Sequence, residues 1–145
     1  MTDSSTPFRM SRKALALLGL LLLLSGCESK NKIDPELSGM TEVGLKVKGK
    51  SVFTYTEGST QLSFNRSLRQ FRAGNDDMTS FFVITCDQLP TGEGQQVKAD
   101  VQWTSGSSVK TTTGLTFEVE KYESTGLVWL WNASDKTGAV VKILN

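Results

Sequence analysis

The feature that most constrains the fold is a strict alternation of apolar and polar residues in several short stretches. Residues 97–103 place apolar side chains at every second position, and residues 115–119 repeat the pattern with Leu115, Phe117 and Val119. Successive side chains of a strand point to opposite faces of a sheet, so a period of two predicts half-buried strands rather than amphipathic helices. The downstream part of the chain is therefore expected to be all-β.

Further short strands are predicted on both sides of these two. Residues 43–47 and 52–56 read as a hairpin with its turn at Gly49, and stretches apolar on both faces read as central strands. Turn signals recur every 8–12 residues, which is typical of a sandwich or barrel. We expect a single antiparallel β-sandwich, or a small barrel, after a cleaved N-terminal signal helix. The remaining predicted strands cover residues 61–64, 79–85, 127–131 and 139–144.

Residues 65–74 fit two structures. Arg66, Arg69 and Arg72 recur at a spacing of three, as do Leu68 and Phe71, which suits a two-turn helix. A strand that turns at residues 74–77 into the next one is the alternative, and we favour it because its neighbours are strands. The arginines are interpreted as a solvated face, with a site for an anionic ligand as the other possibility.

The N-terminal residues carry the parts of an export signal. A basic stretch precedes residues 14–24, eleven apolar residues of which eight are leucine. That run is too short for a comfortable membrane span, which needs about 20 apolar residues, and its length suits a signal peptide. Either Met1 or Met10 could open this signal.

The motif Leu24-Ser25-Gly26-Cys27 closes the apolar run. It resembles the lipobox of bacterial lipoproteins, which implies cleavage before Cys27 and a diacylglyceryl group on its sulfur. Acyl chains on Cys27 would hold the protein on a membrane. The domain that follows resembles small β-rich lipoproteins of Bacteroidetes-type genomes, mostly of unassigned function, in length, strand pattern and a tryptophan-bearing late strand.

This resemblance divides the chain into a signal peptide at residues 1–26, a polar tether at 27–40 and a β domain at 41–145. It implies a lipid-anchored protein of the bacterial cell envelope, at the outer rather than the inner membrane. The membrane is then a partner through the lipid on Cys27, and an envelope glycan or protein is a further expected partner.

Composition narrows the function. The chain has no histidine, so it lacks the side chain best suited to proton transfer at neutral pH and the base that activates serine or cysteine nucleophiles. Loss of the signal removes three positive charges and one negative charge, so the net charge moves from +1 to −1. A near-neutral domain gives no electrostatic footprint for nucleic acid, so no nucleic-acid partner is expected. With Cys27 lipidated, Cys86 has no partner for a disulfide, and we expect it to be a buried, unreactive thiol.

Trp129 and Trp131 are the candidate ligand-binding residues. They project from one face of a predicted strand, about 6.6–6.8 Å apart, and exposed indoles at that spacing could stack on sugar rings. The alternative is that they fill the core, as aromatic pairs commonly do.

Acidic residues and loops give weaker candidates. Asp76 and Asp77 could contact calcium but are expected to form a turn, so no metal or cofactor is predicted. Glu118, Glu120 and Glu123 could include a catalytic carboxylate, but Glu118 and Glu120 share an outward face by the period of two and are expected to be solvated. The predicted loops best placed for binding are residues 74–78, 92–96 and 105–113.

Together these observations predict a membrane-anchored envelope lipoprotein whose β domain has a non-enzymatic binding or structural role. No catalytic residue is predicted. The alternative is a carboxylate-dependent hydrolase, or an inhibitor of an enzyme of the cell envelope.

Overall fold

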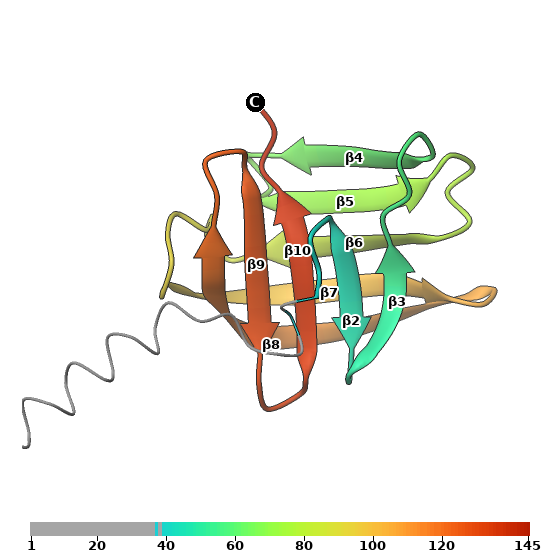
Figure 1. Cartoon of the computed structure of the whole chain (residues 1–145). Coiled ribbons are helices and arrows are strands. Elements are labelled where there is room, and N and C mark those ends of the chain that lie inside the picture. Colours follow the sequence, from blue (N-terminus) through green and yellow to red (C-terminus); the bar gives the residue numbers. More distant parts are fainter. Residues whose placement is uncertain (1–36, 38) are drawn as a thin grey trace, which may run out of the picture. The chain divides into compact units, whose positions relative to one another are not determined.

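The computed structural model describes Leu37 and residues 39–145 (Figure 1). The signal peptide, the lipobox with Cys27 and most of the predicted tether lie outside the described residues. Within the described residues, nine strands form one antiparallel sheet in the order β3-β2-β10-β9-β8-β7-β6-β5-β4, which confirms the all-β prediction. The strands are β2 (Gly44–Val47), β3 (Lys50–Thr54), β4 (Thr60–Asn65), β5 (Gln70–Asn75), β6 (Phe81–Cys86), β7 (Gln96–Ser105), β8 (Ser108–Tyr122), β9 (Leu127–Asn132) and β10 (Thr137–Lys142).

The sheet curls so that its two halves face each other across a core. In Figure 1, β4 to β7 run across the group formed by β9, β10, β2 and β3, while the long β8 joins the two groups. Residues of β10 contact β5, and residues of β3 contact β7. Phe53 and Phe82 meet edge to face between the halves, with ring centroids 5.3 Å apart. The two layers expected of a sandwich are thus the two halves of one continuous sheet.

The alternation of apolar and polar residues in the sequence corresponds to alternating burial along the strands. Along β7 every second residue is buried, from Val97 to Trp103, and the residues between them are exposed. The predicted hairpin of β2 and β3 is also present. Its turn residues, Lys48 and Gly49, have positive φ values of 52° and 82°, as two-residue turns that match strand twist require.

Residues 65–74, whose sequence fitted either a helix or a strand, form a turn followed by a strand. Asn65 ends β4, and its side-chain oxygen accepts hydrogen bonds from the Leu68 N–H at 3.0 Å and from the Ser67 hydroxyl at 2.9 Å. β5 then begins at Gln70 and pairs with both β4 and β6. The strand interpretation is therefore correct from residue 70 onward, and residues 66–69 form the turn.

The prediction of a loop at residues 105–113 is wrong for most of that segment. Ser105 pairs with Ser108, so the loop is a tight turn and β8 starts immediately after it. The reason lies in residues 109–113, Val-Lys-Thr-Thr-Thr, because β-branched side chains favour strands even when the stretch is polar. Further along β8, Gly114 has a φ of +69°, and its N–H donates to the Asp100 carboxylate at 2.9 Å. This lies beside a register shift in the pairing of β7 with β8, where a bulge bends the strand.

Residues before β2 cross the outer face of the sheet. We call Leu37 together with residues 39–43 the strap. Leu37 is fully buried and forms a second apolar cluster with Trp129, Trp131 and Val140, which do not face the main core. The indole N–H of Trp129 donates to the Met40 carbonyl at 2.8 Å. The chain therefore packs on the sheet already within residues 27–40, the predicted tether.

Both apolar clusters are built from residues between Leu37 and Val141. A chain that begins at Cys27 retains all of them.

Candidate functional site

Two glycines shape the outer face of the sheet. The register aligns Trp131, Gly138 and Lys46 in one row across β9, β10 and β2, and Trp129, Val140 and Gly44 in the next. A Cβ added at Gly138 would lie 2.6 Å from the Trp131 ring and 2.7 Å from a methyl of Leu37. The strap side chains therefore fill space that these glycines leave open, which is the close approach that a glycine inside a strand often marks.

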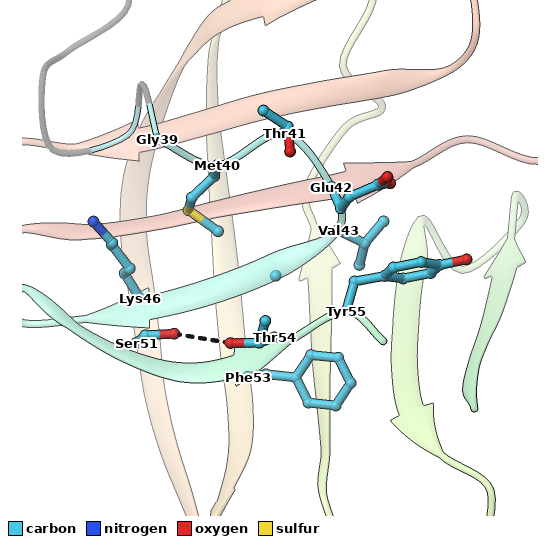
Figure 2. A pocket seen from close by; sticks show the side chains of 11 residues that line it. Gly39, Met40, Thr41, Glu42, Val43, Lys46, Ser51, Phe53, Thr54 and Tyr55 are labelled. Carbon is cyan, nitrogen blue, oxygen red and sulfur yellow. Dashed lines mark hydrogen bonds between the residues drawn. The ribbon is translucent and has the colours of Figure 1, made fainter. Parts of the chain in front are cut away.

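A hollow of about 430 Å³ lies beside the strap (Figure 2). It opens between residues 39–43 and the β2–β3 hairpin. Among the described strands β3 lies at an edge of the sheet and pairs on one side only, so one wall of the hollow belongs to an edge strand. Its lining residues are Gly39, Met40, Thr41, Glu42, Val43, Gly44, Lys46, Ser51, Phe53, Thr54 and Tyr55.

The lining is amphipathic. Met40, Val43 and Phe53 give apolar surface, whereas Ser51 and Thr54 place their hydroxyl oxygens 3.3 Å apart on the edge strand. In Figure 2, Glu42 and Tyr55 lie toward one end of the hollow.

The ammonium group of Lys46 lies toward the other end (Figure 2). Ligand sites of this size usually combine apolar walls with a few polar groups that fix orientation. The hollow can therefore accept a small ligand, or a segment of a larger one, that carries both hydroxyl or amide groups and an apolar face.

Trp129 and Trp131 share one face, as predicted, but neither indole is available at the surface. Their exposed fractions are 3% and 6%, because the strap covers them. Lys121 places its Nζ 4.8 Å from the Trp129 ring centroid, and the Trp131 Nε1 is buried with no hydrogen-bond partner in the described chain. A sugar ring would have to displace the strap before it could stack on either indole.

Cys86 is buried, as predicted, with 2% of its surface exposed. Burial, and after it the charge of Asp87, raises the pKa of the Cys86 thiol to about 12. A thiol with this pKa stays protonated at neutral pH, so it is a poor nucleophile.

Asp76 and Asp77 form a turn, as expected. Asp77 accepts hydrogen bonds from the Thr79 hydroxyl at 2.8 Å and from the Thr79 N–H at 3.2 Å, and these bonds lower the pKa of its carboxyl. Asp76 accepts from the Gln61 amide at 3.2 Å. Within the described part of the chain, no group of three or more His, Cys, Asp or Glu side chains is arranged to hold a metal ion.

Glu118 is exposed and Glu120 is half-buried, with the buried Val119 between them. The pairing of β8 with β9 shifts between Val119 and Lys121, so Lys121 rather than Glu120 stands opposite Trp129. A bulge at this point interrupts the strict period of two. Glu123 forms an ion pair with Lys121 at 3.0 Å.

The three arginines make separate contacts. Arg69 donates from Nε to the Cys86 carbonyl at 2.9 Å, and Arg66 lies with its guanidinium 5.3 Å from the Phe64 ring centroid. Arg72 is exposed on β5. These contacts favour the solvated-face interpretation over a shared anion site.

The hollow was not predicted from the sequence. Its lining comes from the predicted tether and from a hairpin that contains no chemical motif. The signal in the sequence was Gly44, a glycine inside an alternating strand, but the segment that would approach it could not be read from the residues.

Among the residues that the structure describes, no helix has the length and apolar character required to cross a membrane. Comparison of the chain with protein-family models, curated proteins and solved structures found no match. The fold and the hollow thus define a small curled-sheet β domain with an amphipathic hollow beside its N-terminal strap.

Proposed function

We propose that this chain is a lipid-anchored protein of the bacterial cell envelope, held at the outer membrane through Cys27, and that its β domain binds a ligand without transforming it. The anchor is supported by the basic stretch, the apolar run and the motif Leu24-Ser25-Gly26-Cys27 in consecutive order.

The observation that carries the binding role is the hollow over Gly44. It has the volume of a small-molecule site, apolar walls and several polar groups from different segments. Hydroxyl groups of Ser51 and Thr54 can exchange hydrogen bonds with sugar hydroxyls or peptide groups, and Tyr55 offers a ring to an apolar face. The partner proposed for it is an envelope glycan, or a segment of an envelope protein.

The lining favours binding over catalysis. Among the described residues that line the hollow, Glu42 is the one carboxylate, and none of them is a cysteine or a histidine. A glycoside hydrolase of the usual kind needs two carboxyl groups, about 5–10 Å apart across the scissile bond. The alternative of a carboxylate-dependent hydrolase would require a second acid beside Glu42.

A bulky side chain in the hollow tests this proposal. Thr54 is exposed on the edge strand, so Thr54→Trp should leave the sheet intact while it obstructs the hollow. The probes are soluble peptidoglycan fragments, added to the ¹⁵N-labelled chain from residue 27. We expect chemical-shift changes at residues 39–55 and at least tenfold weaker binding by Thr54→Trp.

The matched control is Thr111→Trp, an exposed threonine on β8 that does not line the hollow. It should bind like the unmodified chain. Equal binding by both variants, or shifts confined to other loops, would refute the proposed site. Turnover of the fragments that is lost in Glu42→Gln would instead establish the hydrolase.

A further inference from the structure

Two turns at one end of the strands lie side by side. The β2–β3 turn and the β9–β10 turn are joined by a hydrogen bond from the Gly49 N–H to the Lys136 carbonyl at 2.8 Å. Both turns are at the bottom of the view in Figure 1. We call this region the lysine end, because it carries Lys46, Lys48, Lys50 and Lys136.

The lysine end has an excess of positive charge. Lys48 and Lys50 are exposed, and they flank the tip of the hairpin. Among the described residues of the two turns, the acid is Asp135, whose carboxylate accepts a hydrogen bond from the Thr137 hydroxyl at 2.9 Å. Residues 43–56, which form the β2–β3 hairpin and its flanks, carry three lysines and no acidic residue. The expected net charge of the domain is −1, so its charge is distributed unevenly.

The strap begins at the same end. Leu37 packs against Gly138, and Gly138 is the register partner of Lys46. Cys27 lies ten residues before Leu37. Ten residues span at most about 35 Å even when fully extended, so a lipid on Cys27 would hold the lysine end within reach of the bilayer, and the charges would decide whether it turns toward the surface.

We propose that the lysine end contacts the anionic phospholipid headgroups of the membrane that holds the domain. This inference rests on the proposed anchor at Cys27. A lysine close to an anionic bilayer favours the bound orientation about fivefold. The preference should weaken as salt screens the charges. In this orientation the opposite ends of the strands, with Gly58 and Gly126 in their turns, point away from the bilayer.

Chemical coupling can test this orientation separately from lipidation in the cell. The chain from residue 27 is attached through the Cys27 thiol to a maleimide lipid in nanodiscs, because Cys86 is buried and remains protonated. The nanodiscs contain phosphatidylglycerol and a headgroup-bound gadolinium chelate. The measured quantity is the paramagnetic relaxation of each backbone amide.

We expect the amides of Lys48, Lys50 and Lys136 to relax at least fivefold faster than those of Gly58 and Gly126. The difference should disappear with phosphatidylcholine nanodiscs and at about 0.5 M salt, where the screening length is only about 4 Å.

A double variant, compared with a matched control, tests whether the lysines cause the difference in relaxation. Lys48→Glu with Lys50→Glu should abolish the difference. Lys98→Glu with Lys110→Glu changes two exposed lysines of β7 and β8 and should preserve it. Uniform relaxation on phosphatidylglycerol, or an unchanged pattern in the Lys48/Lys50 variant, would overturn the inference. Because coupling replaces natural lipidation, either result is independent of whether the cell lipidates Cys27.

Discussion

At the scale of single residues, Cys86 shows how the strand ends are fixed. Its N–H donates to the Arg69 carbonyl at 2.9 Å, and its own carbonyl accepts from the Arg69 side chain at 2.9 Å. Arg69 has a φ of +54°, so this reciprocal pair stabilises a turn residue in the left-handed region. The thiol itself lies in the core and takes no part in the pair.

The raised pKa of Cys86 predicts a pH dependence of stability. In the unfolded chain the thiol ionises from about pH 9, whereas in the folded chain its pKa is about 12. The contribution to stability is therefore complete below pH 9 and is lost as the pH rises from 9 to 12, by up to about 1.4 kcal/mol per unit. Between pH 8 and 10.5, the free energy of unfolding in urea should fall about 2 kcal/mol more than in Cys86→Ala.

The Cys86→Ala chain controls for lysines and tyrosines that also titrate in this range. Parallel losses of stability in the two chains would show that the thiol is not protected by the fold.

At the scale of elements, the strap decides which residues are accessible. It covers Trp129 and Trp131 and forms one wall of the hollow, although it contributes no strand of its own. One of its close contacts with the sheet is at Gly138, where Leu37 and the rigid Trp131 ring leave little room for a side chain.

This contact makes Gly138→Ala a test of the strap. The added methyl group would clash with the Trp131 ring and Leu37, so we expect a loss of about 1–3 kcal/mol in the free energy of unfolding. Gly39→Ala is the matched control, because Gly39 has no atom within 4 Å of an added Cβ; its effect should stay below about 1 kcal/mol. Urea titration followed by tryptophan fluorescence measures both. Equal stability of the two variants would contradict the packing of the strap on the sheet.

Local patterning predicted most of the strands because each strand buries one face and exposes the other, as in residues 97–103. It failed where a bulge or turn changes the period. The shift at Glu120 and the extension of β8 to Ser108 depend on pairing with neighbouring strands, which single-strand patterns do not contain. Trp129 and Trp131 were placed on the correct face, but their burial depends on a segment about 90 residues earlier in the chain.

At the scale of the whole molecule, one continuous sheet supplies both an inner and an outer apolar surface. The inner surface forms the main core, and the outer surface receives the strap. Within the described residues the one cysteine is the buried Cys86, so the β domain is held together by this packing and by strand pairing. In the sequence, the strap follows the segment that carries Cys27, the proposed anchor.

The proposed function depends most on the lipid at Cys27. The full chain and its Cys27→Ala variant are expressed in a bacterium, the membranes are separated, and the intact mass of the protein is measured. We predict that the unmodified chain is in the membrane fraction and begins at Cys27 with added acyl mass, whereas Cys27→Ala is released or remains uncleaved. A chain without added mass, or a variant that is equally membrane-bound and cut at the same place, would contradict the account.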